Sequence, residues 1–192
     1  FSGRGAEYYL TLEGMKLLRD MGLSQKAMRT MYNNTKATLE FRQQCLDIFA
    51  AYLRLRELYP ETFSMFTRSE LADFAYFPQP SPDLYLIRKT PLDDLINEYM
   101  LEINTDARFF VQKKRLDVYF EHADSGEWDD QGNGYPILLW ICGDSRMEMK
   151  VQKYLENRLD DLEVRTTTLK ALLNKHSQEK VIWSTEEKLV DL

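Results

Sequence analysis

Two acidic residues stand where one short strand is predicted to begin and a second to end. Asp83 opens the first predicted strand, 83–89, and Glu102 lies near the end of the second, 97–104. If a bend in the second strand brings both carboxylates to one end of the sheet, they could bind a divalent metal. Such a metal would orient water and stabilise a pentavalent phosphate. Asn104 would share a face with Glu102, since side chains two residues apart lie on one side of a strand.

A site that cleaves phosphate esters also needs a cation to stabilise the developing negative charge. Lys113 and Lys114 lie on the predicted helix 105–123 and could reach back towards the carboxylates. The alternative is that Asp83 and Glu102 are two surface carboxylates in an acidic half of the chain. The sequence is compatible with both interpretations.

Several other kinds of site are excluded by the sequence. It contains neither G-x-x-x-x-G-K nor G-x-G-x-x-G, so no glycine loop for phosphates is present, and it lacks the G-x-S-x-G motif of serine hydrolases. Its two cysteines and two histidines do not have metal-ligand spacing, which excludes a zinc site. The polar loop 129–134 is not a calcium loop, because Trp140 stands where a carboxylate ligand is needed.

The 192 residues suit one domain, or one domain with a small appendage. No run of about 18 apolar residues is present, so we expect no membrane span. Few cysteines and no apolar export segment at the N-terminus predict a cytoplasmic protein.

Charge is distributed unevenly along the chain, whose net charge is −6. Residues 1–60 hold 9 basic and 6 acidic residues, a net of +3, whereas residues 61–192 hold 16 and 25, a net of −9. Electrostatic contact with nucleic acid is therefore expected in the first third of the chain. The residues predicted to contact DNA are Arg19, Lys26, Arg29 and Lys36. The alternative for such scattered cations is a solvated helix surface.

Hydrophobic periodicity predicts helices first and a sheet afterwards. A short strand over 6–11 is followed by helices over 11–21, 24–32 and 38–58, and the last carries an apolar stripe that includes Phe41 and Phe49. From Pro82 on, the predicted order is strand, strand, helix, strand, helix, strand: 83–89, 97–104, 105–123, 136–142, 145–157 and 162–168. A short helix over 169–173 and a last short strand over 181–183 are predicted to follow. This order predicts an α/β (α+β) fold, in which a helical N-terminal segment precedes a small mixed sheet flanked by helices.

Six short blocks, spread over most of the chain, match a known pattern. They are YYLTLEGMKLL (8–18), PD (82–83), LEINT (101–105), KKRLDVY with GEW (113–119, 126–128), YPILLWI with Arg146 (135–141), and TTTLKALL with Trp183 (166–173). Together they resemble the replication-relaxation family of plasmid and mobile-element proteins.

The resemblance implies a winged helix followed by a domain similar to the PD-(D/E)XK nucleases. Residues 1–36 would then be the end of the winged-helix unit, with its wing strand and the following helices, and residues 37–192 the nuclease-like domain. Because the chain opens at Phe1 rather than Met, we expect a trimmed or processed fragment whose DNA-reading helix lies upstream.

One position departs from the nuclease pattern. The pattern ends in a lysine two residues after the second carboxylate, and this sequence has Asn104. Either Lys113 or Lys114 substitutes from the helix, or the site is inactive. Asparagine offers no charge to a phosphate oxygen, which favours an inactive site and no cofactor.

The resemblance therefore implies a DNA-associated protein of plasmid or mobile-element replication, relaxation or mobilisation, with a non-catalytic nuclease-like domain. One alternative is a metal-dependent DNA endonuclease that uses Asp83 and Glu102 to hold Mg²⁺. Another is a transcriptional regulator of the element. The expected partners are DNA, held mainly by residues upstream of this chain, other replication or mobilisation proteins, and a second copy in a homodimer.

Overall fold

The computed structural model describes residues 11–22, 28, 37–89, 98–128, 134–156, 158, 162–174, 182–185, 189–190 and 192. The predicted strand 6–11 and helix 24–32 lie outside this part of the chain, apart from Thr11 and Met28, and most of the predicted winged-helix unit lies outside it as well. The chain forms two compact units, residues 1–45 and 46–192. Within the described residues, no helix is long and apolar enough to cross a membrane.

The described part of the first unit contains the predicted helix at 11–21. Helix α1 (Leu12–Asp20) begins after Thr11, whose hydroxyl oxygen accepts a hydrogen bond of 3.1 Å from the Gly14 N–H. The helix ends before Gly22, which has a φ of +94°, a backbone conformation that residues other than glycine rarely adopt.

Helix α3 (Leu39–Leu58) is the predicted long helix, and Pro60 follows its end. Its buried face differs from the predicted apolar stripe, because Phe41 and Phe49 are exposed. The buried positions include Arg54, whose guanidinium donates to the carbonyl oxygens of Leu172 and Asn174, each at 3.0 Å. These two hydrogen bonds hold a polar residue inside, so the helix is rotated relative to the orientation that hydrophobicity alone predicts.

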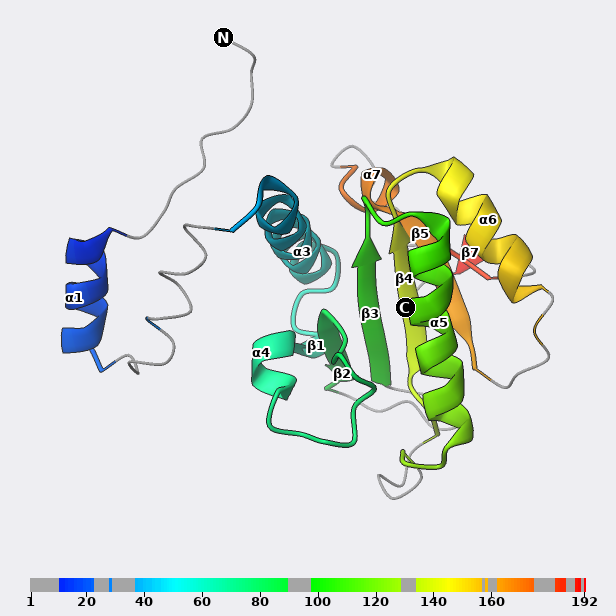
Figure 1. The fold of residues 1–192 in the computed structure, drawn as a ribbon, viewed down its shortest axis with the longest axis horizontal. Helices are drawn as coiled ribbons and strands as arrows, with labels where there is room; N and C mark the ends of the chain where they lie inside the picture. The colour runs from blue at the N-terminus through cyan, green and yellow to red at the C-terminus, as the bar shows by residue number, and fades with distance from the viewer. Residues whose placement is uncertain are drawn as a thin grey trace, which may run out of the picture. The chain divides into compact units, whose positions relative to one another are not determined.

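The second unit is built on a seven-stranded mixed sheet, in the order β1-β2-β3-β4-β5-β6-β7 (Figure 1). The strands are β1 (Phe63–Thr67), β2 (Leu84–Arg88), β3 (Glu98–Asn104), β4 (Ile137–Cys142), β5 (Val164–Thr168), β6 (Trp183–Ser184) and β7 (Leu189–Val190). The first three strands are antiparallel, β3, β4 and β5 are parallel, and β6 and β7 are antiparallel again. The mixed α/β fold is thus confirmed, whereas β1, β7 and helix α4 (Arg68–Leu71) were not predicted.

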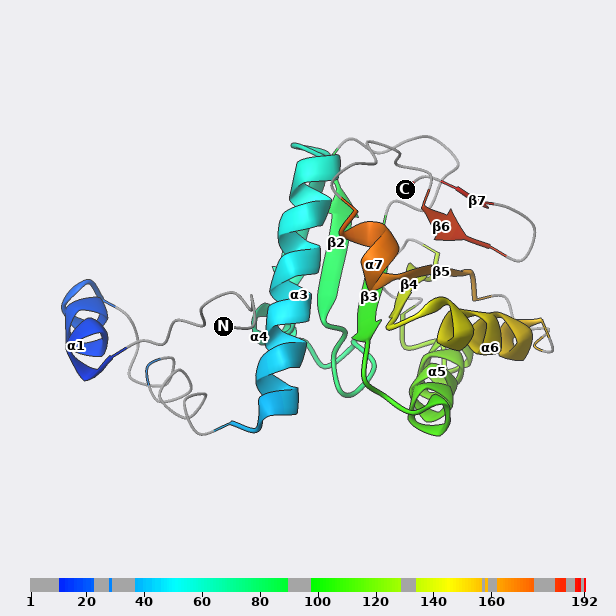
Figure 2. The same cartoon turned by 90° about the horizontal axis from the view of Figure 1, so that it is seen from above.

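Helices cover both faces of this sheet (Figures 1 and 2). Helices α5 (Phe109–Asp124) and α6 (Ser145–Leu155) lie on one face, and α3 and α7 (Leu169–Leu172) on the other. Side chains of β4 alternate between the two cores: Leu139 packs on the α3 side and Trp140 on the α5 side. The predicted doubly buried strand 136–142 is therefore confirmed.

The ends of two helices differ from prediction. Helix α5 begins at Phe109, four residues later than predicted. Helix α6 ends at Leu155 rather than near residue 157, and Asp144 caps its start, since the Asp144 carboxylate accepts a hydrogen bond of 2.7 Å from the Met147 N–H.

Replacing Gly143 with alanine is expected to lower the free energy of unfolding by about 1–3 kcal/mol, the usual cost of overpacking. An added Cβ would lie 2.2 Å from the Thr105 carbonyl oxygen, and the Thr105 hydroxyl is itself held by Asp47 at 2.7 Å. Urea unfolding checks this prediction. Alanine at the exposed Ser145 is the control and should change stability by less than about 0.5 kcal/mol. Equal stabilities of the two variants would contradict the close approach.

Candidate functional site

The structure brings Asp83 and Glu102 together beside the start of β2. Asp83 immediately precedes β2, and its Oδ2 atom accepts a hydrogen bond of 2.9 Å from the Ile103 N–H of the neighbouring β3. Each of the two acids is only 4% exposed. The predicted convergence of the two acids is therefore confirmed, and the alternative that they are surface carboxylates is wrong.

An arginine of α4 lies against both carboxylates. The Nη2 atom of Arg68 is 2.8 Å from Asp83 Oδ1 and 4.0 Å from Glu102 Oε1. The Arg68 side chain is 47% exposed, so it closes the solvent side of the carboxylate pair. A single guanidinium thus contacts the two groups that a metal ion would have to bridge.

A second arginine, from α5, holds Glu102 from the protein side. Arg115 donates to Glu102 Oε1 from Nε at 3.1 Å and also from Nη2. The same oxygen accepts a hydrogen bond of 2.6 Å from the Tyr119 hydroxyl. Arg115 Nη2 also donates to the Pro80 carbonyl oxygen at 2.6 Å, which ties the proline-rich loop to the helix.

Burial and the neighbouring negative charge of Glu102 together raise the pKa of Asp83 from 3.8 to about 6. The positive charge of Arg68 and the hydrogen bond from Ile103 act in the opposite direction. Two carboxylates and two guanidiniums balance in charge within this site. We name these four residues and Tyr119 the arginine–carboxylate cluster.

The raised pKa of Asp83 predicts how stability depends on pH. The folded protein binds this proton more tightly than the unfolded chain, so the contribution to stability is complete below pH 3.8 and is lost as pH rises through about 6. Asp83→Asn removes this titration while keeping an oxygen that can accept from Ile103. Between pH 4 and 6 the wild-type protein should lose about 1–3 kcal/mol relative to this variant in urea unfolding. If the stabilities of the wild-type protein and of Asp83→Asn change with pH in the same way, the raised pKa of Asp83 is contradicted.

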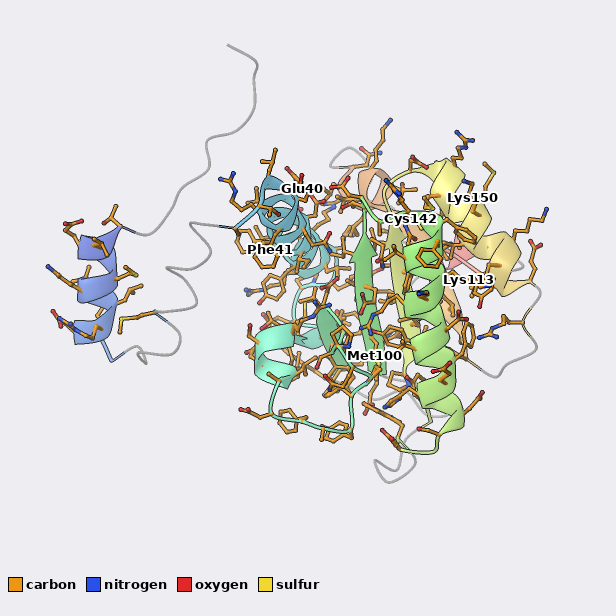
Figure 3. The ribbon with its side chains drawn as sticks, in the orientation of Figure 1. Glu40, Phe41, Met100, Lys113, Cys142 and Lys150 are labelled. Atoms are coloured by element: carbon orange, nitrogen blue, oxygen red, sulfur yellow. The ribbon has the colours of Figure 1, made fainter. Side chains whose placement is uncertain are left out.

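Lys113 and Lys114 do not reach the carboxylates. The Lys113 amine lies 5.2 Å from the centre of the Tyr154 ring, on the side of α5 that faces α6 (Figure 3). The Lys114 amine lies 4.5 Å from the centre of the Phe110 ring. Of the two alternatives, the one in which a lysine of this helix lies beside the carboxylates is therefore not the arrangement found, and Arg115 occupies that position.

Asn104 lies at the end of β3, and its side chain takes no part in the cluster. The side-chain nitrogen of Asn104 is buried and has no hydrogen-bond partner among the described residues. Its backbone oxygen accepts from Gln112 at 3.1 Å, and Gln112 in turn accepts from the Trp140 indole at 3.0 Å. This position therefore contributes a structural contact and no charge.

Of the four residues predicted to contact DNA, Arg19 lies within the described residues. It is 61% exposed on α1, and its Nε atom is 3.6 Å from an Asp20 carboxylate oxygen. Lys26, Arg29 and Lys36 lie outside the described residues.

The cluster does not fit a divalent cation as it stands. Asp83 and Glu102 are acceptable ligands for Mg²⁺, but Arg68 and Arg115 already neutralise them, and an added dication would be repelled by both guanidiniums. Elsewhere in the described part of the chain, no three His, Cys, Asp or Glu side chains lie close enough together to hold a metal.

Comparisons with protein-family models, curated proteins and solved structures give no match to this chain.

Proposed function

We propose that this chain is a DNA-associated protein of plasmid or mobile-element replication, relaxation or mobilisation, and that its nuclease-like domain does not cleave DNA. One observation supports the absence of cleavage above all others. The Arg68 guanidinium contacts Asp83 and Glu102 at 2.8 and 4.0 Å, between the two carboxylates that a nuclease of this kind needs free for its metal.

The surroundings of the carboxylates support the same conclusion. A metal-dependent nuclease holds carboxylates whose negative charges attract the ion, and here both charges are already compensated. The lysine of the nuclease pattern is replaced by Asn104, and Lys113 and Lys114 point elsewhere. The cluster therefore holds β2, β3 and α5 together instead of providing an open catalytic site.

The proposed association with DNA rests on the family resemblance and on the distribution of charge. Residues 61–192, with a net charge of −9, would be repelled by phosphates, whereas residues 1–60 carry +3. DNA contacts therefore belong to the first third of the chain, where Arg19 is exposed. The acidic nuclease-like domain is then available for other proteins of replication or mobilisation.

Binding of the intact protein to labelled duplex DNA, followed by fluorescence anisotropy, tests this proposal. Binding should persist in EDTA and weaken as salt is added. Arg19→Ala should weaken it and reduce the slope of log affinity against log salt by about 1 for one lost phosphate contact. Lys89→Ala removes a cation of the acidic unit and is the matched control that should change neither quantity. Failure of the intact protein to bind duplex DNA at low salt would contradict the proposal.

The second candidate function is a metal-dependent nuclease, favoured by the convergence of the buried Asp83 and Glu102. It requires Arg68 to move away when a metal and DNA bind. A nuclease function predicts that the wild-type protein nicks DNA and that nicking disappears in Glu102→Ala, whereas a non-catalytic function predicts no nicking.

A further inference from the structure

Strand β1 forms one edge of the sheet, and within the described second unit its only strand partner is β2. Two hydrogen bonds fix which backbone groups face β2. Lys89 N–H donates to the Thr62 oxygen at 2.9 Å, and Arg68 N–H donates to the Asp83 oxygen at 3.2 Å. Because these groups alternate along an antiparallel strand, the even-numbered residues of β1 bond to β2, and the odd-numbered residues turn their N–H and C=O groups outward.

The outward-facing backbone groups of Phe63 and Met65 form a short segment that is able to pair. The N–H of Thr67, the third odd-numbered residue of the strand, is not available for pairing, because it donates to a Glu70 carboxylate oxygen at 2.7 Å. The strand sequence FSMFT contains no charge and no proline, the features that normally prevent pairing at a sheet edge. A cleft of about 560 Å³ lies beside the strand, lined by Tyr52 and Arg56 of α3, by Phe63 to Phe66, and by Lys89.

We propose that a second copy of this chain pairs antiparallel with β1, about a two-fold axis that passes at Ser64. In this register Phe63 of each copy lies opposite Met65 of the other, so each outward N–H and C=O group meets its counterpart. A register centred on Met65 would instead require the Thr67 N–H, which Glu70 already holds. In the register centred on Ser64, the outward groups of both Phe63 and Met65 find partners without the Thr67 N–H.

The charges at the strand ends are compatible with the same occupant, because Glu61 pairs with Lys89 and Arg68 with Asp83 within each copy. Glu61, 89% exposed, precedes the start of β1, and Arg68, 47% exposed, follows its end. Antiparallel pairing brings Glu61 of one copy to the end that carries Arg68 of the other, and the symmetry repeats this arrangement. The contact is small, so association belongs at the weak end of protein interfaces.

Sedimentation equilibrium of the chain, from micromolar to millimolar concentration, tests the proposal. The average mass should rise towards twice that of the chain. Ser64→Lys places two like charges directly opposite each other and should abolish association, while Ser145→Lys, at the exposed start of α6, should leave it unchanged. Circular dichroism and thermal unfolding verify that both variants fold.

Disulfide cross-linking tests the register. Opposed residues in a pair that shares no backbone hydrogen bonds have Cα atoms about 4.5 Å apart, within the range that a disulfide spans. With the exposed Cys45 replaced by serine, Ser64→Cys should give a covalent dimer on mild oxidation, and Ser145→Cys should not. A chain that stays monomeric throughout overturns the proposal. So does a dimer that Ser64→Lys leaves intact and Ser64→Cys fails to cross-link, because it would use another surface.

Discussion

Arg115→Ala is expected to lower the free energy of unfolding by about 3–5 kcal/mol, the cost of breaking a buried ion pair from one side. The Arg115 and Glu102 side chains are both almost fully buried. Without Arg115, the Glu102 carboxylate would keep Tyr119 as a donor but would lie beside the like charge of Asp83. The Pro80 carbonyl oxygen would lose a donor as well.

Urea unfolding with a matched pair of variants measures this effect. Lys89→Ala removes the exposed ion pair with Glu61, in which the two charged atoms are 2.8 Å apart, and should cost less than about 1 kcal/mol. The double variant Arg115→Ala, Glu102→Gln should regain part of the loss, because it leaves no unpaired buried charge. If Arg115→Ala costs no more than Lys89→Ala, the cluster does not hold the fold together as described.

Arg68→Ala is expected to create a binding site for Mn²⁺ that the wild-type protein lacks. Removal of a positive charge 2.8 Å from Asp83 and 4.0 Å from Glu102 leaves one arginine against two carboxylates. At an effective dielectric of about 20, one unit charge at about 4 Å contributes roughly 4 kcal/mol, so a gain of at least about tenfold in affinity is expected.

Calorimetric titration with Mn²⁺ measures the gain, at a pH well above 6 because the loss of Arg68 raises the pKa of Asp83 further. Arg68→Lys keeps the positive charge and should bind no metal, and Arg68→Ala combined with Glu102→Ala should lose the new site. Heat of equal size in Arg68→Ala and in the wild-type protein would show that Arg68 does not control access to the carboxylates.

The sequence predicted the two carboxylates because each stands at a recognisable place. Asp83 follows the proline-rich segment and opens an apolar strand, and Glu102 precedes the polar residues that end the next strand. Both strands are short, mostly apolar runs whose residues are largely buried. Strand β4 could also be predicted from its apolar run, because a strand that is buried on both faces needs apolar residues at successive positions.

Arg68 could not be found in the same way. It lies on a four-residue helix that follows β1, and β1 is defined mainly by its pairing with β2, about 20 residues further along the chain. A five-residue strand between Pro60 and Arg68 has too little alternation to distinguish it from a loop. Arg68 is therefore brought beside the carboxylates by the non-local pairing of β1 with β2, which the sequence pattern does not show.

The choice between Arg115 and its neighbouring lysines depends on the rotation of α5. Successive residues of a helix point about 100° apart, so only one of three adjacent cations can face the sheet. Arg115 and Tyr119 are four residues apart and lie on one face, and the buried Tyr119 was the available signal for that face.

Incubation of the intact protein with supercoiled plasmid and Mg²⁺ or Mn²⁺ tests the central claim most directly. With Asp83 and Glu102 held by Arg68 and Arg115, the plasmid should remain supercoiled at micromolar protein. Nicked circles that form with wild-type protein and fail to form with Glu102→Ala would show that the two acids work as a nuclease, and would contradict the account.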